Sequence, residues 1–414
     1  MSQQNIMTLL EQAEAGSSSS IVDLAMLLEA VRCFLNMDVA FTSRFTDSQR
    51  RVELVQASSA VATPIPAGSA EQLDNSYCFK IACGQLDNIV PDTMAHPVTR
   101  GMRVTRQLSI GAYIGVPITL QNGDTYGALC CYDNKPNAAL SRRDVDLLHS
   151  IASYVGQVMG RTLAQQQKQD LTREQVRYVI DQHKIEVVFQ PIYGKHSARY
   201  EYYEVLARFN TDPYRPPNEW LHDADTVGLG LEVESAIIHR VVARLNSAKA
   251  RGLEVRTSIN VSPQMVESGL LPELLKAVDS RQVKIELTEH VRVKDYQRFR
   301  TFLRPLSDRG FKICIDDVGA GFASLKHILE IEPDVIKLDL SLASNIHLDK
   351  KRQALVTGLL AFAHSFNCEV VAEGIETQEE YQALEALGVA YFQGWYFSRP
   401  VPFEQLAESL EQAC

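Results

Sequence analysis

The second half of the sequence alternates apolar, strand-like runs with segments of helical length. Eight such runs follow one another from about Val187: VVFQPI, YYEVLARF, RTSINVS, VKIELTE, FKICIDD, DVIKLDL, EVVAEGIE and AYFQGWYF. Eight strand–helix units in roughly 230 residues indicate an α/β fold of the (β/α)8 barrel type. Only YGKHSAR separates the first two runs, which is too short for a crossover helix. These two strands are therefore expected to be antiparallel neighbours in a modified barrel.

Nearly every one of these runs carries a polar or charged residue near its end. These residues are Glu204, Asn260, Glu286, Asp316, Asp317, Lys337, Glu373 and Gln393. Because the carboxyl ends of barrel strands converge on one mouth, we expect these side chains to be neighbours. One such residue alone could be an ordinary solvated or salt-bridged residue at a strand end. That explanation does not account for polar residues at the ends of seven strands together. Clustered acids need cations to stay ionised, and oxygen ligands favour Mg²⁺ or Mn²⁺ over zinc.

Two of these acids, Asp316 and Asp317, are adjacent in the stretch KICIDDVGAGFASL. Adjacent side chains in a regular strand point to opposite faces, so both can face the mouth only where the strand breaks into a loop. There they could serve two metals, or one of them could bridge two. Two metals held close together are the usual device for in-line displacement at phosphorus.

The first portion of the chain mixes helices with antiparallel strands. Helical spacing marks SIVDLAMLLEAVRCFL, while VAFTSRF and RRVELVQAS are typical of strands. GAYIGVPITL and TYGALCCYD form the clearest hairpin, with Asn122-Gly123 expected to supply the positive φ angles of its turn. A helix follows over SRRDVDLLHSIASYVGQVMGRTL. The polar segment 164–175 lacks glycine and proline and is expected to be a helical linker, which either transmits rotation or sets a dimer, or is a plain spacer.

The bulk properties set the remaining limits. A chain of 414 residues is too long for one ordinary core, so two domains are expected. A net charge of −10 argues against a nucleic-acid polymer or a membrane surface as partner. No apolar stretch has the ~18 residues of a membrane-spanning helix, and the N-terminus does not resemble a signal peptide. The eight cysteines form no CxxC pair. Reduced, buried cysteines in a cytoplasmic protein are therefore expected.

The motifs of the second half resemble those of a known family. From about residue 172 to 414 the chain is similar to an EAL domain, the cyclic-di-GMP phosphodiesterase domain of bacterial signalling proteins. The matching pieces are FQPI, YEVLAR, NVSP, IELTE, IDDVGAGFASL, DVIKLD, VAEGIET and FQGWYFSRP. The chain departs from the family pattern at Val205 and within the loop after the paired aspartates, at Val318, Ala320, Phe322 and Ala323.

The resemblance implies a role for each matching position. Metal ligands would be Glu204, Asn260, Glu286, Asp316 and Asp317, with Glu373 in or beside the metal shell. Catalysis would rest on Lys337 at the attacking water, on Glu373 as a candidate general base and on the ligand Glu204. Substrate contacts would be Gln190, Arg208 and Gln393. Supporting positions would be Glu289, which braces the loop after Asp317, the loop glycines Gly319 and Gly321, and Glu376 near the metals.

The implied reaction is hydrolysis of one phosphodiester bond of cyclic di-GMP, giving linear 5′-pGpG, with Mg²⁺ or Mn²⁺ and two ions per site. Two other readings stay open. One is an EAL-type receptor that binds the dinucleotide with weak or no catalysis. The other is a different metal-dependent barrel enzyme that abstracts a proton beside a carboxylate.

Residues 17–165 resemble a GAF domain, a module that binds small molecules or dimerises. The matching stretch runs from SYCFKIACGQ to GALCCYD. The expected organisation is therefore a GAF domain over 17–165, a helical linker over 166–178 and an EAL domain over 172–414. A homodimer through the EAL domain, the GAF domain or the linker helices is expected, with regulation by an unknown GAF ligand. Cys78, Cys83 and His96 either line a pocket or meet haem, or are ordinary packing residues.

Overall fold

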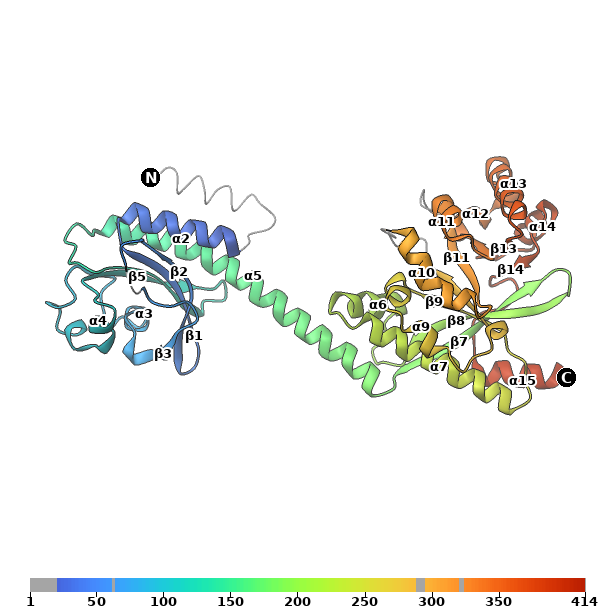
Figure 1. The fold of residues 1–414 in the computed structure, drawn as a ribbon, viewed down its shortest axis with the longest axis horizontal. Coiled ribbons are helices and arrows are strands. Elements are labelled where there is room, and N and C mark those ends of the chain that lie inside the picture. The colour runs from blue at the N-terminus through green and yellow to red at the C-terminus, as the bar shows by residue number, and fades with distance from the viewer. Residues whose placement is uncertain (1–20, 62–63, 288–294, 320–323, 414) are drawn as a thin grey trace. The chain divides into compact units, whose positions relative to one another are not determined.

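The computed structural model describes residues 21–61, 64–287, 295–319 and 324–413 (Figure 1). The chain divides into two compact units, Met1–Lys168 and Gln169–Cys414, which are taken in turn below. Within the described residues, no helix combines the length and apolar character needed to cross a membrane.

The first unit is built on a six-stranded antiparallel sheet. Its strand order is β3-β2-β1-β6-β5-β4. The strands are β1 Val39–Phe45, β2 Gln49–Ala57, β3 Ala70–Gln72, β4 Ile89–Val90, β5 Ala112–Thr119 and β6 Thr125–Asp133, and the helices are α2 Ile21–Leu35, α3 Tyr77–Ala82, α4 Arg103–Gln107 and α5 Arg142–Asp181. The expected antiparallel α+β character of this half is confirmed.

Side chains on the two faces of this sheet join separate apolar clusters. Leu129 and Cys131 of β6 pack with α2 and the start of α5. Ala128, Cys130 and Tyr132 point to the other face, into the cluster that contains α3. Successive strand residues alternate between faces, so one strand serves both clusters.

The turn of the β5–β6 hairpin differs in detail from the expectation. Gly123 has φ of 90°, but Asn122 does not take a positive φ. Leu120 and Asp124 close the turn by a backbone hydrogen bond of 2.8 Å, so the loop holds three residues. In a three-residue loop only the glycine needs the left-handed conformation.

Helix α5 continues without a break for 40 residues. It includes the polar segment 164–175, so the expected helical character of the linker is confirmed. Its last turns belong to the second unit, where Val176 and Val179 pack with Phe209 and Trp220.

The second unit is a closed barrel of eight strands, β7 to β14. The strands are β7 Ile185–Gly194, β8 Arg199–Phe209, β9 Thr257–Val261, β10 Val283–Leu287, β11 Lys312–Val318, β12 Val335–Leu338, β13 Glu369–Ala372 and β14 Tyr391–Phe392, and β15 Val401–Pro402 adds to the outer edge of β7. All neighbours from β8 to β14 are parallel, whereas β7 is antiparallel to both β8 and β14. The expected modified barrel is confirmed.

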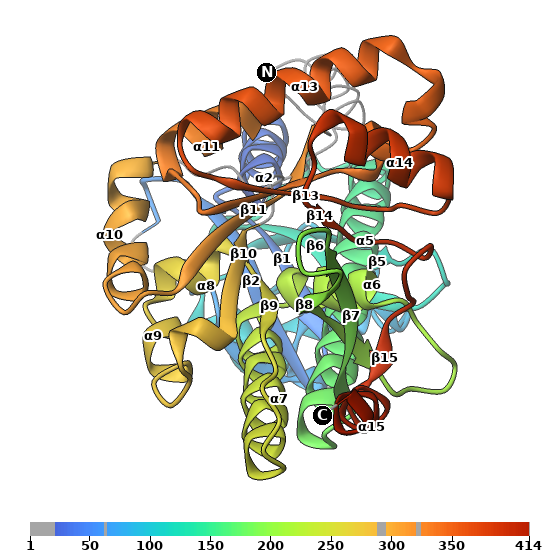
Figure 2. The same cartoon turned by 90° about the vertical axis from the view of Figure 1, so that its right-hand side faces the viewer.

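Helices surround these strands (Figure 2). They are α6 Pro217–Thr226, α7 Gly230–Ala250, α8 Pro263–Ser268, α9 Leu271–Leu274, α10 Tyr296–Ser307, α11 Ser324–Ile331, α12 Leu340–Ala343, α13 Lys350–Ser365, α14 Gln378–Leu387 and α15 Phe403–Ala413. The main apolar core lies between the outward side chains of the strands and these helices, as with Ile259, Ile285 and Ile313.

Inward side chains fill the barrel in layers, as strand alternation requires. A middle layer contains Ile192, Tyr202, Cys314, Val335 and Val371. Below it, at the amino ends of the strands, lies a layer that we call the floor, formed by Lys284, Lys312 and Glu369. The two ammonium groups lie 3.2 Å from separate oxygens of the single carboxylate. The layer above the apolar one is the mouth.

Candidate metal centre at the mouth of the barrel

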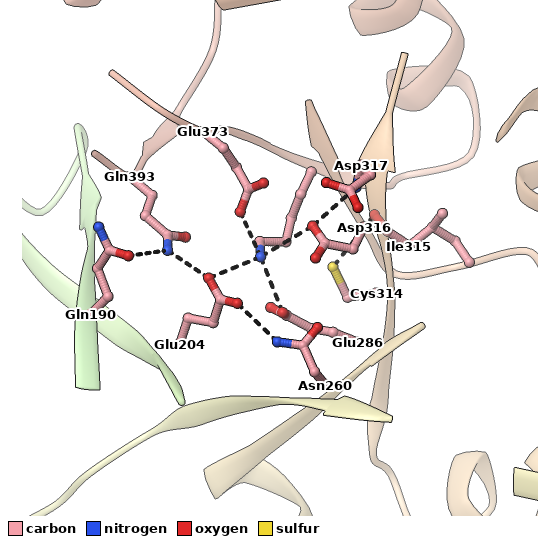
Figure 3. Close-up of polar contacts among 11 residues, drawn as sticks. Gln190, Glu204, Asn260, Glu286, Cys314, Ile315, Asp316, Asp317, Glu373 and Gln393 are labelled. Atoms are coloured by element: carbon pink, nitrogen blue, oxygen red, sulfur yellow. Dashed lines mark hydrogen bonds and ion pairs between the residues drawn. The ribbon is translucent and has the colours of Figure 1, made fainter. Parts of the chain in front are cut away.

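The mouth collects polar side chains from the carboxyl ends of the barrel strands. Glu204 and Asp316 lie two residues beyond Tyr202 and Cys314 of the middle layer, so the same inward alternation that buries that layer also turns these acids inward. The side chains brought together are Glu204, Asn260, Glu286, Asp316, Asp317, Lys337, Glu373 and Gln393 (Figure 3).

Lys337 lies at the centre of this group with 1% of its surface exposed. Its Nζ is 2.6 Å from Glu373, 3.1 Å from Glu286, and 3.2 Å from both Glu204 and Asp316. An ammonium group has three protons, so it cannot fully satisfy four carboxylates. One buried lysine therefore anchors four strand ends but leaves acceptor capacity unused.

A chain of amide hydrogen bonds fixes Glu204. The Gln393 amide donates to Glu204 Oε2 at 2.6 Å and to Gln190 Oε1 at 3.2 Å, and Asn260 Nδ2 donates to Glu204 Oε1 at 2.9 Å. Figure 3 shows this line of side chains running from Gln190 to Asn260. Because both carboxylate oxygens of Glu204 are held, its orientation is set before any ligand arrives.

Burial and charge shift the acids in opposite directions. Burial raises the pKa of Glu286 to about 8, helped by the charges of Glu204 and Asp316 and opposed by Lys337. Burial and the same kind of repulsion hold the pKa of Glu373 well above its usual range. Burial acts on Glu204 too, but Lys337 and the two amide donors outweigh it and lower its pKa. Without added positive charge, the site keeps some of its acids protonated.

Asp316 and Asp317 face the same site through a bulge and not through a loop after the strand. They lie within β11, where the register with β12 shifts between Ile315 and Val318. Asp317 has φ of 57°, in the left-handed region that aspartate tolerates better than most residues. The bulge breaks the alternation, so the expectation of a strand end at this point is corrected to an irregularity inside the strand.

Two overlapping groups of carboxylates could hold metal ions. Ligand atoms of Glu204, Glu286 and Asp316 lie within 4.8 Å of one another, as do those of Asp316, Asp317 and Glu373. Over the part of the chain that the structure describes, five carboxylates meet one lysine here. Glu286 Oε1 and Gln393 Oε1 are buried there without a hydrogen-bond partner. The all-oxygen donor set of the two groups and these two orphaned acceptors fit two divalent cations.

Some residues expected at the site lie apart from this cluster. Arg208 is half-buried, donates to the neighbouring Ala207 carbonyl at 2.7 Å, and lines a cavity beside the mouth. Glu376 is exposed, and its backbone N–H donates to Glu380. Glu289, Gly321 and the loop positions 320, 322 and 323 lie outside the described residues. Gly319 has φ of 113°, and a Cβ there would overlap Leu342.

A contact that the sequence did not reveal holds the end of β9. Glu234 of α7 accepts hydrogen bonds from the backbone N–H and hydroxyl of Ser262, at 2.6 and 2.7 Å. Burial raises the pKa of Glu234 to about 7, although the Ser262 donors oppose the shift. Ser262 caps α8 and follows Asn260 by two residues, so this clamp fixes the strand end that carries Asn260. A serine before a proline is typical of a helix start, but nothing in the sequence indicated Glu234.

A cavity of about 450 Å³ opens beside the mouth. Arg208 and Asn260 line it together with Asp225, Glu234 and apolar side chains such as Ile237. Its size suits a small organic ligand. The cavity therefore brings the Arg208 guanidinium close to Asn260, the amide that donates to Glu204.

Two family models match the chain. The EAL domain model matches residues 173–400 and the GAF domain model matches residues 19–159. The second unit therefore carries the EAL match, and the antiparallel sheet of the first unit lies within the GAF match.

Individual relatives are distant. An uncharacterized signaling protein of Caulobacter vibrioides is 29% identical over 309 residues, which cover 73% of this chain and 37% of that protein. The cyclic di-GMP phosphodiesterase PdeR of Escherichia coli is 28% identical over 208 residues, covering 48% of this chain and 31% of PdeR. The chain spans about a third of the length of these curated relatives.

Solved structures show the same fold. An EAL domain protein from Listeria monocytogenes is 24% identical with a TM-score of 0.51, covering 56% of this chain and 95% of that one. The EAL enzyme Bd1971 in its cGMP-bound form is 19% identical with a TM-score of 0.55, covering 91% of this chain and 93% of that one. At these identities the likeness is one of fold alone.

Proposed function

The chain belongs to the EAL domain family, and from that premise we propose that its barrel hydrolyses one phosphodiester bond of cyclic di-GMP to give linear 5′-pGpG. The observation that carries the proposal is the mouth itself, where four carboxylates contact Lys337 and Asp317 completes the second of two overlapping carboxylate groups. Relatives named as cyclic di-GMP phosphodiesterases, such as PdeR, support the choice of substrate.

The two carboxylate groups divide between two metal positions. Glu204, Asn260, Glu286 and Asp316 would hold one divalent cation, and Asp317 and Glu373 would hold a second with Asp316 shared between them. We propose Mg²⁺ or Mn²⁺ because every donor is oxygen. When bound, such ions supply Lewis-acid stabilisation of the charge that develops at phosphorus.

The chain's own residues bind the substrate and move the proton. Arg208 lines the 450 Å³ cavity, and its guanidinium would bind a phosphate group of the substrate through two parallel hydrogen bonds. Gln190 and Gln393 orient the dinucleotide from the opposite side of Glu204. Lys337 would hold the attacking water by turning one N–H from a carboxylate to it, and Glu373, whose carboxylate lies 2.6 Å from the Lys337 Nζ, would accept the proton.

The N-terminal unit would regulate this reaction. Helix α5 runs from that unit into the barrel unit, and its last turns pack on Phe209, the residue after Arg208. A change in the position of α5 would therefore reach a substrate contact directly. We also propose that the chain forms a homodimer through the EAL domain, the GAF domain or α5. A ligand of the GAF domain would be the regulatory signal.

The test is hydrolysis of cyclic di-GMP by the purified full chain, with Mg²⁺ and separately with Mn²⁺, followed by chromatography of the products. Linear pGpG in the wild type, and its loss in Asp316→Asn, is the expected result. Tight binding of the dinucleotide without product, with either metal, would contradict the proposal of an active enzyme in the full chain. It would favour a receptor that binds cyclic di-GMP without cutting it. Repeating the assay on the barrel unit alone separates a receptor from an enzyme held inactive by its N-terminal unit.

A further inference from the structure

A small cavity in the first unit is lined by residues of the sheet and of α3 (Figure 1 shows both elements). Its volume is about 10 Å³, which is room for about one species of the size of water. Cys78 of α3, Arg50 of β2 and Tyr113 of β5 line it. Of the three residues that the sequence offered as pocket candidates, only Cys78 lines this cavity. Cys83 is exposed, and His96 Nδ1 accepts from the Val98 N–H.

A second thiol lies beside Cys78. Cys130 of β6 faces the same side of the sheet and lies in the same buried cluster as Cys78, and its thiol is one of the groups that lower the pKa of Cys78. The Cys78 sulfur is also 3.2 Å from the Tyr113 hydroxyl. Opposite Cys130 on β5 stands Gly115, where a Cβ would come within 2.9 Å of the Cys130 sulfur. Only glycine at 115 leaves the room that this thiol occupies.

The cavity also has a source of positive charge. Arg50 is 3% exposed, and its Nη2 pairs with Glu71 at 2.9 Å. Its Nε and Nη1 are buried with no hydrogen-bond partner among the described residues. Leaving donors of a guanidinium unsatisfied in the interior costs free energy, so a negative charge or an oxygen acceptor in the cavity would be stabilised.

These surroundings favour the ionised form of one thiol. Burial opposes ionisation of Cys78, but the Cys130 thiol, the Arg50 charge and the Tyr113 and Ser43 hydroxyls outweigh it and lower its pKa to about 6. Cys131 is the adjacent residue on the opposite face of β6 and is as deeply buried. It lacks such donors, and burial raises its pKa. Reactivity follows the thiolate, so the two neighbours should behave differently.

We propose that Cys78 and Cys130 are a hydroperoxide-reactive pair, in which Cys78 is the attacking thiolate, Cys130 the resolving thiol and Arg50 the group that stabilises charge in the cavity. Hydrogen peroxide is small and uncharged, which suits a site of this size. This chemistry is independent of the barrel.

The chemistry balances with hydrogen peroxide as oxidant. The Cys78 thiolate attacks one peroxide oxygen, an S–O bond forms and the O–O bond breaks. The leaving hydroxide takes the proton that Cys78 gave up and departs as water. The Cys130 sulfur then attacks the Cys78 sulfur, the S–S bond forms and the S–O bond breaks, releasing a second water. Two thiols and one peroxide become one disulfide and two waters.

The experiment treats the full chain with one equivalent of hydrogen peroxide, blocks remaining thiols with N-ethylmaleimide and maps a non-reduced digest by mass spectrometry. The expected product is a Cys78–Cys130 bridge. Cys131→Ser is the matched control and should keep the bridge, which also removes ambiguity between the adjacent thiols. Cys130→Ser should lose it and leave Cys78 as a sulfenic acid that dimedone traps.

Arg50 gives a second readout that a purely structural role would not move. Arg50→Gln should slow oxidation of Cys78 by about tenfold or more, because the thiolate fraction falls, while Arg50→Lys should recover most of the rate. Two outcomes would overturn the proposal. One is modification of the exposed Cys33 and Cys83 with Cys78 untouched in the wild type. The other is a bridge that uses Cys131 in place of Cys130.

Discussion

The two ends of the barrel interior each combine lysine and carboxylate side chains, but in opposite proportions. At the floor, Lys284 and Lys312 share the single carboxylate of Glu369. At the mouth, in the part of the chain that the structure describes, Lys337 alone meets the carboxylates of four strands, and Asp317 adds a fifth carboxylate. Among the described residues, the two floor lysines have their carboxylate, whereas the mouth has more carboxylates than cations.

This difference separates structural polar groups from groups that await a ligand. A buried ion pair with its partners in place needs nothing more, although it adds little net stability. A buried cluster of like charges is unstable until a counter-charge arrives, which is the property that a metal site needs. The same substitution, an acid to its amide, should therefore have opposite consequences at the two ends.

The largest expected effect is at the mouth. Asp316→Asn keeps the shape of the side chain but removes a charge shared by both metal positions. Hydrolysis of cyclic di-GMP should fall by about three orders of magnitude, equivalent to about 4 kcal/mol of transition-state stabilisation. The free energy of unfolding of the metal-free protein should not fall, because repulsion in the cluster is relieved. Parallel assays of turnover and of denaturant unfolding in EDTA check both statements, and near-normal turnover would contradict the metal assignment.

The next effect concerns Lys337, the lysine at the centre of the mouth. Lys337→Ala removes the partner of four buried carboxylates, so the free energy of unfolding in EDTA should fall by about 3 kcal/mol. Added Mg²⁺ should recover part of this loss, since a cation can replace the lost charge. Turnover should drop more than dinucleotide affinity. Equal stability of variant and wild type in EDTA, or an affinity loss with normal turnover, would show that Lys337 has another role.

The clamp on β9 should give the mouth a pH-dependent stability. Glu234 has a pKa of about 7 in the folded chain against 4.5 in the unfolded one, so the folded state holds its proton longer. This group therefore costs the wild type stability as pH rises from 4.5 to 7, by about 3 kcal/mol in all. Glu234→Gln does not titrate, so its unfolding free energy relative to wild type should rise by that amount between pH 4 and pH 8. Denaturant unfolding at the two pH values measures it, and a constant difference would refute the shift.

The smallest effect should come from the floor. Glu369→Gln leaves Lys284 and Lys312 without their carboxylate, and the free energy of unfolding should fall by about 1 to 2 kcal/mol because Glu369 is partly exposed. Turnover of the folded variant should match wild type. Calorimetry beside the hydrolysis assay tests the contrast with Asp316→Asn. Lost turnover without lost stability would erase the distinction between the two ends.

The sequence predicted the barrel because eight apolar runs of strand length alternate with segments of helical length. It also predicted which acids share the mouth, since strand ends in a barrel must meet. It did not predict the bulge at Asp317, because a single left-handed residue leaves no mark in an apolar pattern. Nor did it predict the contact of Glu234 with Ser262, which joins α7 to the end of β9 and depends on how the helix packs.

Closure of the barrel also bears on how the chain folds. The strand pair β7–β14 and the contact of Gln190 with Gln393 join residues about 200 positions apart, as the separation of 203 between the two glutamines shows. Contacts between residues so far apart in the sequence form slowly, because the entropy cost of closing a long loop comes before the contacts can stabilise the fold. Glu204 is held by Gln393 from the last strand. A chain that lacks its last strand therefore has most of the acids of the mouth but not the contact that holds Glu204.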